Sequence, residues 1–149
     1  MARFIFSLQN ILNMKEKLED QAKNDFAHAN LRLQEAVAER EALEQRLDAE
    51  KQKLQQDISA ALDIGKIRQR ENAVEILRMY VRQQTLVVLQ REKEVEVARE
   101  QLNEAMKERK TFEKLREKAF DAFLEEEKQR EQKEVDELVS YRYGIDKKE

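Results

Sequence analysis

The sequence predicts an all-α protein in which two long helices form an antiparallel coiled-coil hairpin. Its 149 residues include no Pro and only two Gly, and 41% of them are Asp, Glu, Lys or Arg, a composition that favours long helices. Apolar residues recur at steps of three and four in each half of the chain, which is the spacing of a coiled-coil seam. Gly65 lies between the two stripes, where a turn is needed.

The first stripe starts at Leu8 and predicts a helix over about residues 4–63. Only three charged residues, Lys15, Arg40 and Glu50, interrupt it. Since a half-buried strand would alternate every second residue, this spacing indicates a helix.

The second stripe starts at Ile67 and predicts a helix over about residues 67–143. We place the turn at about residues 64–67, because a glycine after the last periodic residue is a common end of a helix. Gly144, the second glycine, is expected to mark the end of the second helix. Together the two helices and the turn form a single extended coiled-coil domain over residues 1–149.

The two stripes supply the expected core. It consists of Leu18, Phe26, Leu33, Leu43, Leu47, Leu54, Val81, Val88, Val95, Leu102, Phe112 and Phe123. A fold at Gly65 also sets a register, in which the numbers of facing residues sum to about 131, give or take a turn. The facing pairs are then Leu54 with Leu77, Leu43 with Val88, Leu33 with Ala98, Phe26 with Ala105, and Leu8 with Phe123.

An unbroken rod that pairs with a second copy along its whole length is the alternative architecture, because one glycine costs a helix only about 1 kcal/mol. We favour the hairpin, since helix pairs are commonly joined by turns of a few residues.

The first helix runs out near Phe4 in this register, so residues after about 127 have no partner within the chain. The stretch LEEEKQREQKEVDEL, Leu124 to Leu138, has Val135 as its single apolar residue between the end leucines. Charge pairs at four-residue spacing stabilise such a helix by only ~0.2–0.5 kcal/mol each, so we expect this segment to fray when alone.

The charges and the missing residue types exclude several functions. The net charge is −3 with both signs interspersed, so no basic field indicates a nucleic-acid partner. The apolar run at residues 86–89 is far too short to cross a bilayer, and no signal peptide is evident, so we expect a soluble protein without direct membrane insertion. With no Cys and with His28 as the single histidine, we expect no metal site and no cofactor.

No glycine-rich phosphate motif and no nucleophile beside a base occurs in the sequence. We therefore predict that the chain is not an enzyme, has no catalytic residues, and works through its surfaces. One candidate surface near the turn comprises Ile76, Met79, Tyr80, Leu86, Val87 and Leu89. Another, at the open end, comprises Phe4, Phe6, Phe120, Phe123, Leu124, Tyr141 and Tyr143.

Both ends of the chain resemble a known family. The segments FIFSLQNIL (residues 4–12) and ERKTFEKLREKAFDAFLEEEKQREQKEVDEL (residues 108–138), at this separation and total length, are similar to the flagellar export protein FliJ, a family of small coiled-coil proteins. The resemblance implies a cytoplasmic component of the flagellar type III export apparatus. It also implies an antiparallel helix pair similar to the central stalk of rotary ATPases.

The same resemblance implies partners. Members of the family insert into the hexameric ring of the export ATPase, contact the export gate protein in the membrane, and associate with export chaperones. We therefore expect a non-enzymatic stalk that couples the ring to the gate and lies peripherally at the inner face of the membrane. The implied ring-binding residues are Phe4, Phe6, Leu8, Gln132, Lys133, Val135, Asp136, Glu137 and Leu138. The implied gate-binding residues are Ala73, Ile76, Leu77 and Tyr80.

Two other functions remain open on the residues alone. One is a chaperone, or an escort of chaperones, that holds export substrates or their partners in its coiled-coil groove. The other is a structural spacer that associates with a second copy of itself.

Overall fold

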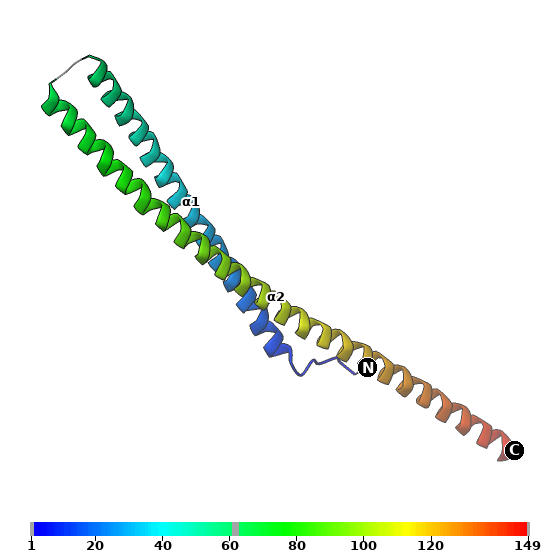
Figure 1. Ribbon diagram of the computed structural model, residues 1–149. Coiled ribbons are helices and arrows are strands. Elements are labelled where there is room, and N and C mark those ends of the chain that lie inside the picture. Colours follow the sequence, from blue (N-terminus) through cyan, green and yellow to red (C-terminus); the bar gives the residue numbers. More distant parts are fainter. Residues whose placement is uncertain (1, 61–62, 149) are drawn as a thin grey trace. The chain divides into compact units, whose positions relative to one another are not determined.

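A computed structural model describes residues 2–60 and 63–148 of the chain. Almost all of these residues belong to two helices, α1 (Gln9–Ser59) and α2 (Ile64–Lys148) (Figure 1). No strand occurs within the two described ranges. The helices pack against each other as an antiparallel hairpin, which confirms the predicted fold class.

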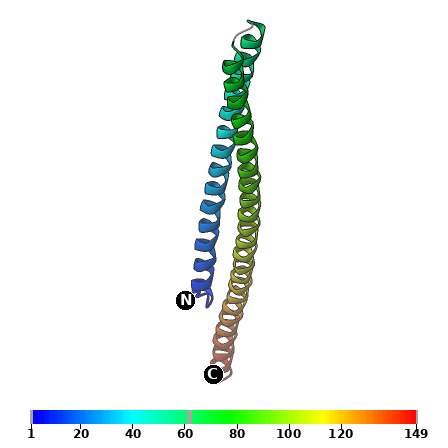
Figure 2. The ribbon, with the colours of Figure 1, turned by 60° about the vertical axis from the view of Figure 1, so that its left-hand side comes forward.

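The chain divides into two compact units, which we describe separately. The turn unit is Gln21–Asn103, and the terminal unit comprises residues 2–20 and 104–148. Within the turn unit, α1 and α2 run side by side in opposite directions (Figure 1, Figure 2). The expectation of one extended domain stays a prediction.

The seam of the turn unit is apolar. Leu43 and Leu47 of α1 form a buried cluster with Val74 and Leu77 of α2. A second cluster of small residues follows along the helices. It contains Ala29, Val95 and Ala98, with Phe26 and Leu33 packed against it. Burying a leucine or valine side chain contributes about 1.5–3 kcal/mol, so these layers hold the two helices together.

Most of the expected core residues face the seam, with one exception. Leu18 is 48% exposed, whereas its neighbour Glu19 is 5% exposed. The expected stripe steps from Lys15 to Leu18, but the structure steps four residues to Glu19 and then three to Ala22. Leu43, Leu47, Val88 and Val95 are buried, and Phe26, Leu33, Leu54, Val81, Leu102, Phe112 and Phe123 are half-buried.

Two of the expected pairs share a hydrophobic cluster, Leu54 with Leu77 and Leu33 with Ala98, but other contacts shift the register by about one heptad. Phe26 packs against the cluster of Val95 and Ala98, about two turns before the expected Ala105. Nε2 of Gln84 donates a hydrogen bond to the backbone carbonyl of Ala36 at 3.0 Å. Gln84 lies about three turns before the residue expected to face Ala36, so the shift has the same direction further along the seam. Because the seam repeats every seven residues, a slip of one heptad brings stripe against stripe again, and periodicity alone cannot choose between the two.

The turn explains this shift. α1 ends at Ser59 and α2 begins at Ile64, so Gly65 lies in the first turn of α2 instead of closing α1. Oδ1 of Asp63 accepts a hydrogen bond from the backbone N–H of Gly65 at 3.2 Å, as the side chain of an N-cap residue does. The turn expected at residues 64–67 is therefore helical. Residues 61 and 62, which we expected in the first helix, lie outside the described residues.

The outer ends of the helices also differ from the expectation. α1 starts at Gln9 and not near residue 4, and the backbone N–H of Gln9 bonds to the carbonyl of Phe6 at 3.1 Å. Packing of Phe4 against α2, described below, holds this segment outside the helix. α2 continues through Gly144 to Lys148, because one glycine costs a helix only about 1 kcal/mol.

Candidate protein-binding surfaces

Charged residues in the seam of the turn unit are paired. The guanidinium of Arg70 contacts Asp57 at 3.0 Å and Glu50 at 3.3 Å. These contacts raise the pKa of Arg70, mainly through the hydrogen bond to Asp57. Glu94 accepts hydrogen bonds from Arg91 at 3.0 Å. That bond, more than any other contact, lowers the pKa of the Glu94 carboxyl.

The seam of the terminal unit holds a second charged group. Arg109 bonds to the buried Glu19 across the seam and to Glu113, four residues further along its own helix, at 2.8 Å. The hydrogen bonds to Glu113 and then to Glu19 raise the pKa of Arg109. Lys15 contacts Glu108 at 2.9 Å. Because these groups satisfy one another, they fix the pairing of the helices and are poor candidates for a binding site.

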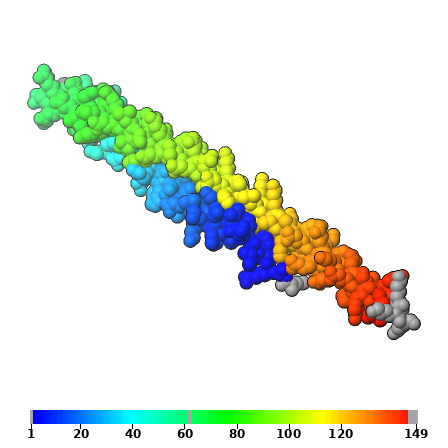
Figure 3. Space-filling model, turned by 90° about the horizontal axis from the view of Figure 1, so that it is seen from below, coloured from blue at the N-terminus to red at the C-terminus, as the bar shows by residue number. Residues whose placement is uncertain are grey.

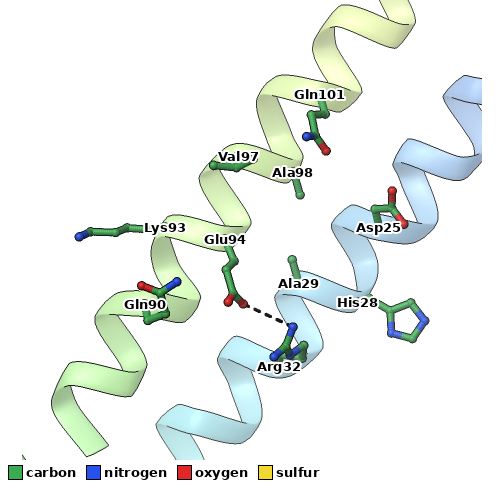
Figure 4. A pocket seen from close by; sticks show the side chains of 10 residues that line it. All are labelled: Asp25, His28, Ala29, Arg32, Gln90, Lys93, Glu94, Val97, Ala98 and Gln101. Atoms are coloured by element: carbon green, nitrogen blue, oxygen red, sulfur yellow. Dashed lines mark ion pairs between the residues drawn. The ribbon is translucent and has the colours of Figure 1, made fainter. Parts of the chain in front are cut away.

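A shallow groove of about 400 Å³ lies between the helices of the turn unit (Figure 4). Ala29 and Ala98 form its floor, and the ion pair of Arg32 with Glu94, at 3.6 Å, crosses it. The side chain of His28 points away from α2 and is exposed. The groove exists because small residues line the seam here. Within the described residues, no group of His, Cys, Asp and Glu side chains could hold a metal ion.

The last part of α2, residues 124–145, is here called the overhang. Every residue from 128 to 145 is exposed. In Figure 3 the N-terminal segment (blue) lies against the yellow and orange part of α2 and does not extend over the red part on this face. The exposed apolar residues of the overhang are Leu124, Val135, Leu138, Val139, Tyr141, Tyr143 and Ile145.

Sequence reasoning pointed to the polar part of the overhang and missed part of its apolar end. Val139 and Ile145 follow Val135 and Leu138 at spacings of four and seven, which place apolar side chains along one side of a helix. The signal was therefore present in the sequence. The predicted ring-binding residues of the overhang, which are all exposed, are Gln132, Lys133, Val135, Asp136, Glu137 and Leu138.

The predicted ring-binding residues of the N-terminus lie elsewhere on the terminal unit. The ring of Phe4 packs on Phe120 and Phe123, with centroids 5.1 and 5.5 Å apart. Phe6 is buried and Leu8 is half-buried. The pair expected between Leu8 and Phe123 is thus replaced by Phe4 with Phe123. Phe4 forms an aromatic staple that closes the hairpin, and it lies on α2 before the overhang begins.

The start of α2 carries the other candidate surface, here called the outer face. It consists of six exposed residues, Ile76, Met79, Tyr80, Leu86, Val87 and Leu89. Of the predicted gate-binding residues, Ile76 and Tyr80 belong to it. Leu77 is buried in the seam and Ala73 is half-buried, so neither side chain offers much surface to a partner.

None of the helices within the described ranges is long and apolar enough to span a membrane.

Comparison with known proteins shows the family of the chain. The family model for the flagellar FliJ protein matches residues 4–148, which is nearly the whole chain. The chain belongs to the FliJ family. It is thus a component of the type III export apparatus, and the resemblance of the two sequence segments is confirmed.

A solved structure gives the same fold. A protein from Chlamydia trachomatis, described as a candidate YscO homolog, aligns with a TM-score of 0.62 and 21% identity, over 100% of this FliJ family member and 99% of the other chain. No curated protein matches the sequence significantly. At this identity the structural likeness supports the fold.

Proposed function

We propose that this FliJ family member is a stalk-like adaptor that binds the ring of the export ATPase through the overhang and contacts the export gate through the outer face. It has no catalytic role of its own in this proposal. The observation that carries it is the overhang, in which α2 outruns the staple made by Phe4 and Phe123 and exposes an apolar stripe. A helix with an exposed apolar stripe can bind in an apolar collar, meaning a circle of apolar side chains on the inside of a ring.

The overhang has two parts that suggest how it binds. Residues 125–134 contain charged and polar side chains alone, and the apolar residues are concentrated from Val135 onward. The polar part keeps the apolar end at a distance from the staple. We therefore propose that the apolar end makes the ring contact and that Phe4, Phe6 and Leu8 support the helix behind it.

The gate contact is proposed for Ile76 and Tyr80, which are exposed. Through this contact the protein would be held peripherally at the inner face of the membrane, on the cytoplasmic side. Association with export chaperones stays a prediction from the family.

Mixing the protein with the export ATPase tests the ring contact. We expect the protein to accelerate ring assembly, measured by sedimentation, and to accelerate ATP hydrolysis. Leu138→Asp, on the overhang, should reduce the stimulation at least about tenfold, since a carboxylate cannot be buried in an apolar collar without a partner. Ile58→Asp, at a position on α1 that is 54% exposed against 63% for Leu138, serves as the control and should leave the stimulation unchanged.

A deletion of all residues after Glu127 completes this test. It should abolish stimulation while circular dichroism shows that most of the helix remains. If the folded full-length protein changes neither ring assembly nor hydrolysis, the stalk proposal is wrong, and the chaperone or spacer functions take its place.

A further inference from the structure

α2 carries a second stripe with heptad spacing, on the side away from α1. Ile76, Met79, Gln83 and Leu86 follow one another at steps of three, four and three. Each lies two positions after a seam residue, the first of them after Val74. Two positions turn an α-helix by about 200°, so this stripe and the seam lie on opposite sides of the helix.

The burial of the side chains agrees with this geometry. Leu86 is 66% exposed, whereas Val88, two positions later, is 1% exposed. Tyr80, Val87 and Leu89 widen the stripe into the outer face. A helix that is apolar on two opposite sides packs against two neighbours, and α1 supplies only one of them.

The charges beside the outer face are basic. Residues 76–90 contain two arginines, Arg78 and Arg82, and no Asp or Glu, although the whole chain has a net charge of −3. Glu75 is shared between Arg78 at 3.6 Å and Arg82 at 3.9 Å, so one carboxylate meets two guanidinium groups. The Arg82 side chain is largely exposed and lies next to Gln83 in the stripe.

We propose that the outer face binds an amphipathic helix of a partner protein whose flanking residues are acidic. The bound helix packs along α2 between Ile76 and Leu89, a distance of about 20 Å, or two heptads. A second copy of this chain is a poor occupant, because the outer faces of two copies would bring Arg78 and Arg82 close to the same arginines. The inference deepens the proposed gate contact and rests on it, since Ile76 and Tyr80 belong to the same face.

Two synthetic peptides of three heptads test the inference. Both carry Leu at the a and d positions, one has Glu at e and g, and the other has Lys there, so that each repels itself and stays monomeric. Fluorescence anisotropy with the full-length protein should show the Glu peptide binding at least about tenfold more tightly than the Lys peptide. Added salt should reduce this difference.

Variants of the protein locate the binding surface. Leu86→Glu should weaken binding of the Glu peptide at least about tenfold, and Arg82→Glu should shift the preference toward the Lys peptide. The matched control is Leu31→Glu, an exposed leucine on α1, which should bind as the parent does. Equal binding of the two peptides, binding of neither, or no effect of Leu86→Glu would overturn the inference.

Two further measurements separate this inference from the proposed function. A dimer in sedimentation velocity that Leu86→Glu abolishes would assign the outer face to a second copy and overturn the inference. The cytoplasmic domain of the gate protein should compete with the Glu peptide. If the peptide binds and the domain does not, the inference stands and the gate contact fails; if the domain binds without competing, the gate contact stands and the inference is overturned.

Discussion

At the scale of single residues, position on the helix decides what a side chain contributes. Leu18 and Glu19 are neighbours, yet the leucine is exposed and the glutamate is buried against Arg109. The buried carboxylate of Glu19 is tolerated in the seam because it forms an ion pair with a cation on the facing helix. Such a pair specifies which turns of the two helices face each other. An apolar layer alone does not specify this.

Val88 and Val97 allow a direct comparison of buried and exposed positions. Both are valines on α2, but Val88 is 1% exposed and Val97 is 53% exposed. Val88→Ala should lower the free energy of unfolding by about 1–3 kcal/mol, because it removes buried methyl groups and leaves a cavity. Val97→Ala should change it by no more than about 0.5 kcal/mol. Urea denaturation measures both, and equal losses would show that the seam is misplaced.

Glu94 should contribute to the acid sensitivity of the turn unit. Its pKa is lowered in the folded protein, chiefly by the hydrogen bond from Arg91. A carboxyl with a depressed pKa stabilises the fold above its unfolded pKa, near 4.3, and loses that contribution as the pH falls through the lower folded value. In Glu94→Gln, thermal stability should therefore fall less steeply below about pH 4.5 than in the parent. An identical pH profile would contradict the pairing.

At the scale of the elements, the cap of α2 decides where the hairpin turns. The carboxylate of Asp63 accepts the hydrogen bond from the backbone of Gly65, which starts α2 at Ile64. The seven-residue repeat permits more than one register, and the position of this cap selects among them.

Substitutions at Gly65 and Asp63 distinguish the two descriptions of the turn. A Cβ at Gly65 would lie 3.6 Å from the Asp63 carboxylate, an ordinary contact, so Gly65→Ala should stabilise the protein by up to about 1 kcal/mol. A left-handed glycine that ends α1 would instead make this change destabilising. Asp63→Ala should cost about 0.5–2 kcal/mol through loss of the cap. Thermal denaturation shows whether each of the two substitutions stabilises or destabilises the protein.

Cross-linking checks the pairing of the helices in the terminal unit. The sequence has no Cys, so Lys15→Cys with Glu108→Cys introduces one defined pair, at side chains whose charged atoms lie 2.9 Å apart. A short bis-maleimide should join them within one chain. Lys15→Cys with Arg116→Cys, the pair that the register expected from the sequence would favour, is about 12 Å further along the helix and should react much more slowly. The reverse order would restore that register.

At the scale of the whole molecule, stability should differ between the seam and the overhang. The seam residues of the turn unit are buried between two helices, whereas residues 128–145 are exposed. Amide hydrogens of the overhang should therefore exchange within seconds to minutes, and those around Val88 should exchange at least about a hundredfold more slowly. Mass spectrometry of exchanged peptides measures this. Equal protection would mean that another surface covers the overhang, and a dilution series would then test for a second copy.

The function of the chain is also distributed at this scale. The ring contact is proposed for one end of α2 and the partner helix for the other, so each can be removed without the other. A variant with Leu138→Asp should keep the binding of the Glu peptide, and a variant with Leu86→Glu should keep the stimulation of the ATPase.

The sequence by itself determined the fold class, the two helices and the stripes that face each other, because helix propensity and seven-residue spacing are local properties of the chain. It also indicated the overhang, because the apolar stripe of the seam fades after Phe123, and it indicated the outer face near the turn. The register and the burial of Glu19 in place of Leu18 were decided only by the tertiary structure. Because the seam repeats every seven residues, apolar stripe meets apolar stripe in more than one register. The register that forms therefore depends on contacts between distant residues, on the cap at Asp63, and on the staple made by Phe4.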